Sequence, residues 1–163
     1  MPRIIIADDD ELVVGIVRAA LEARGHIVGE LTDGKPVKDV VELKRPDVVI
    51  LDCSMAEVSG IMALKEIRGS SSAFATPVLM LTGRRSHADE EIAFVAGASD
   101  YLRKPFDPDE LVARVEALID KSGETRPAAA PGYRAHRAGD GGLGTYGANG
   151  ANGANGQASR HAR

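Results

Sequence analysis

The stretch Asp47-Val48-Val49-Ile50-Leu51-Asp52 decides the fold of this chain. Consecutive apolar and mostly β-branched residues between two acids are typical of a strand that is buried on both faces of a parallel sheet. Such a strand ends here in a carboxylate, and a parallel sheet covered by helices gathers its reactive groups at the carboxyl ends of its strands. Asp52 is therefore the first candidate for a functional residue.

Strand patterns alternate with helical patterns on both sides of this stretch. The other predicted strands are 3–7, 27–31, 78–82 and 100–104, and the helical patterns occupy about 11–22, 37–43, 60–69, 88–96 and 108–121. This alternation predicts a doubly wound α/β fold: a five-stranded parallel sheet in the flavodoxin-like order 2-1-3-4-5, with helices on both faces. In the helix at 88–96 we expect Ile92, Val95 and Ala96 to point inward.

The composition fits one ordinary domain with a short extension. The 163 residues are 44% hydrophobic, which is enough for a core. The single cysteine, Cys53, excludes an internal disulfide, and we interpret it as a small hydrophobic residue. The apolar runs are shorter than a membrane span and the start has no signal pattern, so we expect a cytoplasmic protein without membrane insertion.

The charge and residue types change near Lys121. The acidic excess behind the net charge of −4 lies before this point, which argues against direct DNA binding. From 122 to 163 the chain is basic and rich in Gly, Ala and Asn, with almost no large aliphatic residues. Such a segment cannot offset the entropy of ordering. We therefore predict a folded domain at 1–121 and a disordered tail at 122–163.

Polar residues end several of the predicted strands. Asp8 and Asp9 follow the first strand, Asp52 ends the third, Thr82 ends the fourth, and Lys104 ends the fifth. Clustered carboxylates repel one another and need a cation, and hard oxygen ligands favour Mg²⁺. An ammonium and a hydroxyl beside them would suit an anion with several oxygens, of which phosphate fits best.

Five short motifs, in this order and spacing, resemble those of the receiver domain of two-component response regulators. They are Ile-Ile-Ile-Ala-Asp-Asp-Asp at 4–10, Pro-Asp-Val-Val-Ile-Leu-Asp at 46–52, Met55 with Ser59-Gly60, Leu-Thr-Gly at 81–83, and Asp-Tyr-Leu-Arg-Lys-Pro-Phe at 100–106. Each motif alone is weak, but together they are highly specific. The resemblance covers residues 3 to about 121.

The resemblance implies a phosphorylation site and a metal site. Asp52 would be the phosphoacceptor, which becomes an aspartyl phosphate by attacking a phosphohistidine. Asp9, Asp52 and the backbone carbonyl of Ser54 would hold Mg²⁺, and Asp8 would act through a bound water. The metal would neutralise charge on the transferred phosphoryl group.

The resemblance also implies a switch. Lys104 would pair with a phosphoryl oxygen, and its peptide bond to Pro105 would be cis. Thr82 would move its hydroxyl toward the phosphoryl group, and Tyr101 would swing inward. These movements would remodel the face formed by the fourth helix, the fifth strand and the fifth helix, where a downstream protein would bind.

The chain is thus expected to act as a stand-alone receiver. Its partners would be a sensor histidine kinase or phosphotransfer protein and a downstream protein, with phosphorylation-dependent homodimerisation as a further possibility. It would catalyse its own phosphotransfer and dephosphorylation but would carry no separate enzyme domain. Ser54 and Arg84 occupy positions that influence the phosphoryl lifetime in the family, and Ala56 replaces the usual proline.

Two alternatives belong to other classes. The altered loop at Ala56 is compatible with a pseudo-receiver that binds a partner without being phosphorylated, although the intact set of acids argues against it. A flavin-binding protein with the same strand order would need a glycine or hydroxyl cluster after the first strand, and this chain has acids there.

Overall fold

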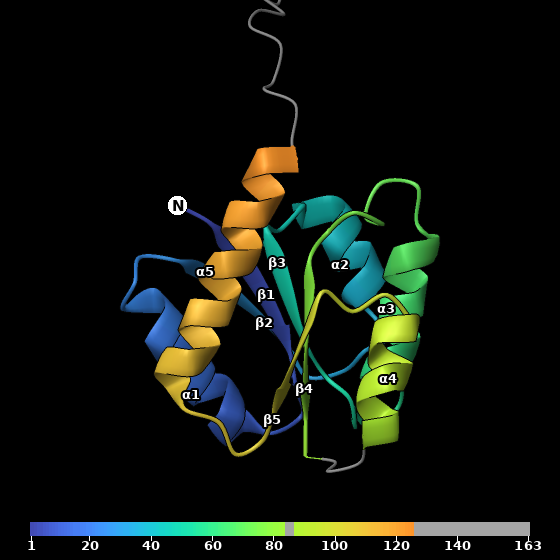
Figure 1. Cartoon of the computed structure of the whole chain (residues 1–163), viewed down its shortest axis with the longest axis horizontal. Coiled ribbons are helices and arrows are strands. Elements are labelled where there is room, and N and C mark those ends of the chain that lie inside the picture. Colours follow the sequence, from blue (N-terminus) through green and yellow to red (C-terminus); the bar gives the residue numbers. More distant parts are fainter. Residues whose placement is uncertain (84–86, 126–163) are drawn as a thin grey trace, which may run out of the picture. The chain divides into compact units, whose positions relative to one another are not determined.

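The computed structural model of the protein describes residues 1–83 and 87–125. Strands and helices alternate from one end of this region to the other (Figure 1). The elements are β1 (Arg3–Ala7), α1 (Glu11–Glu22), β2 (Ile27–Leu31), α2 (Val37–Lys44), β3 (Val48–Asp52), α3 (Gly60–Gly69), β4 (Val78–Thr82), α4 (His87–Val95), β5 (Asp100–Arg103) and α5 (Pro108–Thr125). The strands form one parallel sheet in the order β2-β1-β3-β4-β5, which confirms the predicted fold class.

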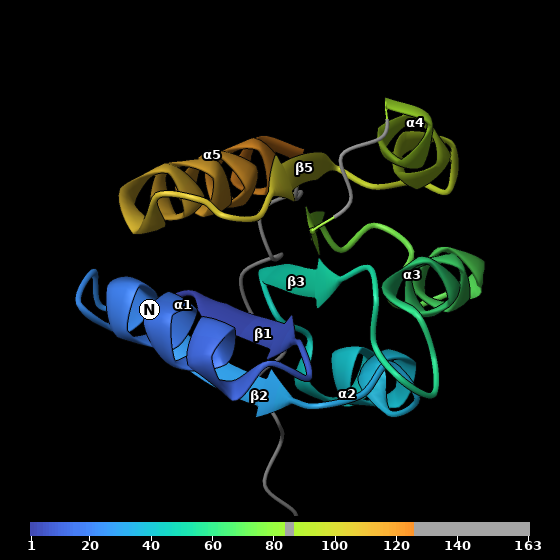
Figure 2. The same cartoon turned by 90° about the horizontal axis from the view of Figure 1, so that it is seen from below.

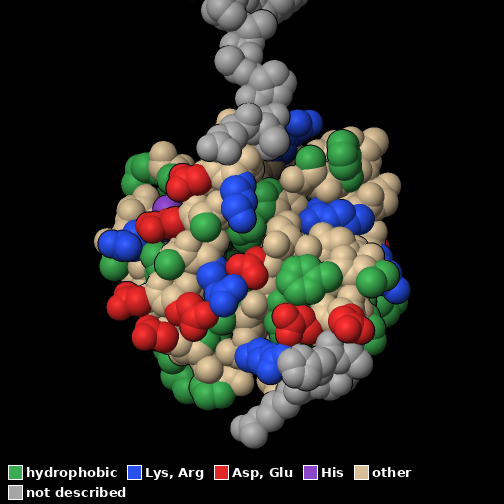
Figure 3. All heavy atoms as spheres, viewed as in Figure 1, with side chains coloured by type: hydrophobic (Ala, Val, Ile, Leu, Met, Phe, Trp, Pro, Cys, Tyr) green, Lys and Arg blue, Asp and Glu red, His purple; other side chains and the backbone are tan. Residues whose placement is uncertain are grey.

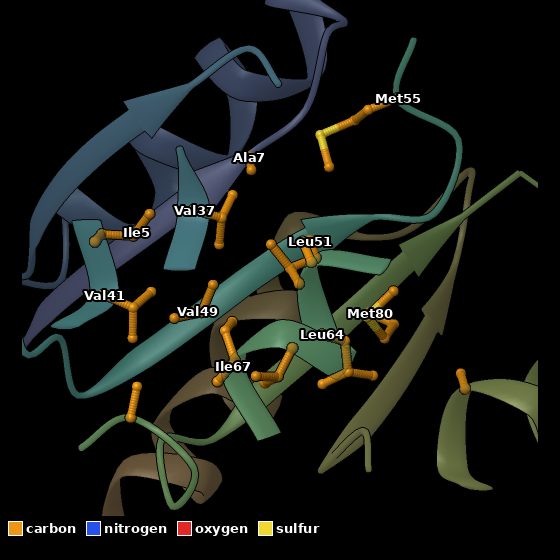
Figure 4. Close-up of a cluster of buried hydrophobic side chains, with 14 of the residues drawn as sticks. Ile5, Ala7, Val37, Val41, Val49, Leu51, Met55, Leu64, Ile67 and Met80 are labelled. Carbon is orange, nitrogen blue, oxygen red and sulfur yellow. The ribbon is translucent and has the colours of Figure 1, made fainter. Parts of the chain in front are cut away.

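The sheet is the middle of three layers. Helices α1 and α5 cover one face, and α2, α3 and α4 cover the other (Figure 2). Successive side chains of a strand point to opposite faces, so β3 contributes to two cores. Val48 and Ile50 pack with α1 and α5, whereas Val49 and Leu51 pack with α2 and α3 (Figure 4). Every residue of β3 is buried, as its apolar run predicts.

Local side chains cap the helices next to the sheet's carboxyl edge. Asp10 caps α1 by accepting hydrogen bonds from the backbone N–H groups of Leu12 and Val13. Ser59 caps α3 by accepting a hydrogen bond from Met62 N at 3.3 Å. These bonds satisfy N–H groups that have no partner within the helix. They also fix where the loops after β1 and β3 end.

Helix α4 differs from the prediction. Its buried residue is Ala93, whereas Ile92 and Val95 are 53% and 89% exposed. The predicted inward direction of Ile92 and Val95 is therefore wrong, and Ala96 is half-buried against the core. An apolar residue on a helix indicates a preference for burial, but the neighbouring elements decide which side is covered.

The end of the folded domain differs from the predicted boundary. Helix α5 continues to Thr125, beyond the predicted boundary at Lys121. The rest of the predicted tail, 126–163, lies outside the described residues, so its disorder stays a prediction. None of the described helices has both the length and the apolar character that a membrane crossing requires.

Candidate functional site

The candidate site lies at the carboxyl edge of the sheet. Asp8 follows β1, Asp52 and Thr82 are the last residues of β3 and β4, and Lys104 follows β5. The strand register brings Asp52 opposite Leu81, and the Lys104 N–H donates a hydrogen bond to the Thr82 carbonyl oxygen at 2.7 Å. The topology therefore gathers residues that are far apart in sequence, as the prediction from strand ends required.

Three carboxylates meet at this edge. Carboxylate oxygens of Asp8, Asp9 and Asp52 all lie within 4.8 Å of one another. Asp8 is 1% exposed and Asp52 is 4% exposed, whereas Asp9 faces solvent. Burying two carboxylates side by side is unfavourable unless positive charge lies beside them.

Lys104 supplies part of that positive charge. Its ammonium donates hydrogen bonds to Asp8 Oδ2 at 2.6 Å and to Asp52 Oδ1 at 2.8 Å. Burial by itself lowers the pKa of Lys104, but the hydrogen bonds to Asp52 and Asp8 outweigh burial and raise the pKa above its ordinary value of 10.5. Burial raises the pKa of Asp8 above 3.8, and the hydrogen bond from Lys104 offsets only part of this effect. Lys104 is thus held charged between two acids.

The loop after β3 provides the second partner of Asp52. The backbone N–H of Ser54 donates to Asp52 Oδ2 at 2.8 Å. Asp52 therefore accepts one hydrogen bond on each carboxylate oxygen, from Lys104 on one side and from Ser54 on the other. This arrangement fixes the orientation of the carboxylate plane.

Thr82 and Tyr101 lie next to each other behind the carboxylates. Thr82 is fully buried, and Tyr101 is 6% exposed with its ring centroid 6.4 Å from that of Phe94 in α4. Burial raises the pKa of Tyr101, and the nearby Thr82 hydroxyl offsets part of this rise. Among the described residues, the buried Tyr101 hydroxyl has no hydrogen-bond partner in good geometry. The structure thus has Tyr101 in the inward position.

The donor set fits a divalent cation. The Lys104 ammonium offsets only part of the charge of Asp8, Asp9 and Asp52, so a cation at the exposed side of the cluster would lower the repulsion. Carboxylate oxygens are the ligands that Mg²⁺ prefers, and the exposed Asp9 leaves room for the waters that Mg²⁺ retains.

Comparison with known proteins identifies the family. Residues 4–116 match the family model described as the response regulator receiver domain. The chain belongs to this family. The resemblance inferred from the five motifs is therefore confirmed. The peptide bond between Lys104 and Pro105 is cis, as that resemblance implied.

Relatives of the receiver domain include longer proteins. The chain is 33% identical over 127 residues to the alkaline phosphatase synthesis transcriptional regulatory protein PhoP of Bacillus subtilis, covering 78% of this chain and 52% of that protein. It spans about half the length of the curated relatives that it matches.

Solved structures match the receiver domain over nearly their whole length. The receiver domain of the Francisella response regulator 1452 has a TM-score of 0.70 at 30% identity, covering 75% of this chain and 99% of that one. The receiver domain of the sensor histidine kinase PA1611 from Pseudomonas aeruginosa has a TM-score of 0.68 at 28% identity, covering 73% and 98%. That structure has a magnesium ion coordinated in its active site cleft.

Some parts of the site were missed by the sequence analysis or lie outside the described residues. The ion pair between Lys104 and Asp8 was not predicted, because the sequence carries no signal for the distance between two loops. Gly60 was predicted to begin a helix and to belong to the third motif, but its contact was not predicted: a Cβ there would overlap the Asp52 carbonyl oxygen. Arg84 lies outside the described residues, so its effect on phosphoryl lifetime stays a prediction.

Proposed function

We propose that this receiver accepts a phosphoryl group on Asp52 from a sensor histidine kinase or phosphotransfer protein and signals through protein contacts. The observation that supports this most is the Asp52 carboxylate itself. It is nearly buried, has one hydrogen bond on each oxygen, and lies beside two further acids that suit a metal. A carboxylate kept in this setting is a preorganised nucleophile.

The proposed reaction transfers phosphorus from nitrogen to oxygen. An Asp52 oxygen forms a bond to the phosphorus of a phosphohistidine, the P–N bond breaks, and the imidazole leaves and takes up a proton. Lys104 exchanges its bond to Asp52 for one to a phosphoryl oxygen, and Thr82 supplies a hydroxyl. Mg²⁺ held by Asp9, Asp52 and the Ser54 carbonyl, with Asp8 acting through a bound water, would supply charge neutralisation.

The proposed output face comprises α4, β5 and α5. Phosphorylation adds charge and acceptor oxygens at Asp52, which attracts the Thr82 hydroxyl and the Lys104 ammonium to the phosphoryl group and favours the inward position of Tyr101. Tyr101 contacts Phe94 in α4, so its position affects that helix. Figure 3 looks onto this face, where apolar, acidic and basic side chains are interspersed. Such a mixed surface suits a reversible protein contact.

Acetyl phosphate with Mg²⁺ tests the phosphorylation step. The whole chain should gain one phosphoryl group by intact mass, and the gain should disappear on treatment with hydroxylamine, which cleaves acyl phosphates. Asp52→Asn should gain none, while Asp39→Asn on the exposed side of α2 should behave as the wild type. Labelling of Asp52→Asn would overturn the proposal.

Light scattering and partner capture test the output. Phosphorylated wild type should retain proteins that Asp52→Asn does not, and its solution mass should show whether a homodimer forms. Identical partners and identical mass for both proteins would contradict the proposed role of the α4, β5 and α5 face. None of the contacts within the described residues favours a receiver that only binds and is never phosphorylated.

A further inference from the structure

Gly34 lies buried in the loop between β2 and α2, directly against the loop between β3 and α3. A Cβ at position 34 would overlap the Val58 carbonyl oxygen and would lie 3.0 Å from Val58 C and 3.1 Å from Val58 Cβ. The two nearest of these atoms, the Val58 carbonyl oxygen and carbon, belong to the backbone, which cannot rotate aside as the end of a long side chain can. The absence of a side chain at Gly34 therefore sets how closely the two loops approach.

Glycine is required at position 34 because there is no room for a side chain, and not because of the backbone conformation. Among the described residues, the glycines with positive φ are Gly25 and Gly97, so the backbone of Gly34 is open to other residues. Local bonds also fix the turn: Lys35 N donates to Asp33 Oδ1 at 2.7 Å, and Val37 N donates to the Gly34 carbonyl oxygen at 3.2 Å. These local bonds hold the shape of the turn, so a side chain at position 34 could not be accommodated by bending the turn without losing them.

The loop that Gly34 contacts carries the groups around Asp52. It includes Ser54, whose N–H donates to Asp52 Oδ2, and Met55, whose side chain is buried with Leu51 and Ala7 (Figure 4). Its chain has Ala56 where the family usually has proline, so it lacks that constraint on φ. A contact from another element can constrain the loop in its place, and Val58 is where Gly34 of the β2–α2 turn approaches it.

We infer that Gly34 is a positioning residue for the phosphoacceptor loop, acting through the Val58 backbone on Ser54 and thereby on the metal and Asp52. The inference rests on the proposed function and extends it to a loop that contributes no ligand. Residues that orient metal ligands typically change metal affinity about 10- to 100-fold when they are replaced. A displacement of about 1 Å away from the chemistry can have a similar effect on rate.

The test compares Gly34→Ala with Gly69→Ala. Gly69 ends α3 at the opposite edge of the sheet, and a Cβ there meets nothing within 4 Å. Mg²⁺ binding to the whole chain is measured by calorimetry, and backbone amide chemical shifts of 53–59 are recorded without metal. Gly34→Ala should shift these amides and weaken Mg²⁺ binding by about 10-fold or more, whereas Gly69→Ala should do neither.

The outcomes distinguish failure of the inference from failure of the proposed function. If the wild type binds Mg²⁺ and Gly34→Ala binds it equally well, the inference is wrong and the proposed function stands. If the wild type binds no Mg²⁺ and takes no phosphoryl group, the proposed function fails and the inference with it. Should Gly34→Ala not fold, Asp33→Ala replaces it, because losing the bond to Lys35 N loosens the same turn without added bulk. A smaller loss of Mg²⁺ affinity in that variant supports the inference, and an unchanged affinity overturns it.

Discussion

The Lys104 ammonium lies 2.6 Å from Asp8 Oδ2, although 96 residues separate the two in sequence. The same ammonium lies 2.8 Å from Asp52 Oδ1, so one cation joins two nearly buried acids. Lys104 and a bound divalent cation thus act on the same negative charge. Removing either one should make the site depend more strongly on the other.

Replacing Lys104 with Met should destabilise the metal-free protein and strengthen Mg²⁺ binding. Asp8 and Asp52 would stay buried without the ammonium that pairs with them, which should lower the free energy of unfolding by about 2 kcal/mol. This loss is smaller than for a fully buried pair because Lys104 is partly exposed. Urea unfolding with and without Mg²⁺ measures the free energy of unfolding of both proteins. Adding Mg²⁺ should reduce the difference in this free energy between Lys104→Met and the wild type. Lys65→Met, on the exposed side of α3, is the control. An equal loss of stability at all Mg²⁺ concentrations would contradict the shared role.

Replacing Asp8 with Asn should stabilise the metal-free protein at neutral pH. Burial raises the pKa of Asp8 in the folded state, so the folded protein binds this proton more readily than the unfolded chain. The unfavourable contribution of the charged form is present above the folded pKa and is relieved as the pH falls toward 3.8. Asn keeps the shape without the charge, so we expect a gain of about 1 kcal/mol that shrinks at lower pH.

Unfolding of Asp8→Asn in urea at several pH values, with a chelator present, checks this pH dependence. Asp39→Asn, which changes an exposed acid, serves as the control for net charge. The same variant should bind Mg²⁺ more weakly, since the cluster loses one carboxylate. A difference between wild type and Asp8→Asn that is constant with pH would show that Asp8 does not titrate as its burial implies.

Replacing Arg68 with Ala should destabilise the domain without touching the acids. The Arg68 guanidinium donates hydrogen bonds to the carbonyl oxygens of Phe74, Thr76 and Gly97, at 2.9, 2.8 and 2.8 Å. It thereby joins α3 to the loops before β4 and β5. Loss of these bonds should cost about 3 kcal/mol, because carbonyl groups lose their partners. Arg68→Lys should recover little of this, since an ammonium lacks the planar fork of donors. Thermal unfolding measures both, and full recovery with Lys would contradict the role of geometry.

The sequence predicted those features that depend on strand pattern alone. The apolar run of β3 buries all of its residues, and strand ends in a parallel sheet share one edge, so Asp8, Asp52 and Lys104 gather at the predicted edge, although the ion pair between Lys104 and Asp8 was not predicted. Helix α4 was harder to predict: the small residues Ala93 and Ala96 pack against the core, whereas the larger Ile92 and Val95 stay exposed. Pattern indicates that a helix has an apolar side, but tertiary packing selects the side.

Loop contacts could not be predicted because they depend on distances between elements. His26 is buried, with Nε2 lying 3.5 Å from Glu116 Oε1 in α5, and its place just before β2 carries no sequence signal for that contact. The contacts of Gly34 and Gly60 could not be predicted for the same reason. Their sequence context predicts a turn and a helix start, whereas their close approach to Val58 and Asp52 appears only in the folded chain.

In Gly60→Ala, helix propensity and packing should change the free energy of unfolding in opposite directions. Gly60 begins α3, and exchanging glycine for alanine in a helix usually stabilises by about 0.5–1 kcal/mol. A Cβ at Gly60, however, would overlap the Asp52 carbonyl oxygen and lie 2.9 Å from Asp52 C and 3.2 Å from Cys53 Cα. Strain of this kind in a packed interior typically costs about 1–3 kcal/mol, so packing should win and Gly60→Ala should destabilise.

Gly15→Ala in α1 provides the matched control for Gly60→Ala. A Cβ at Gly15 meets nothing within 4 Å, so the propensity term should act alone and raise the free energy of unfolding. Urea unfolding of both variants should therefore give opposite signs. Since the obstructed atoms at Gly60 belong to Asp52 itself, that variant should also lose most labelling by acetyl phosphate. Stabilisation of both variants would mean that the Asp52 backbone can move freely, which would contradict a rigidly held phosphoacceptor.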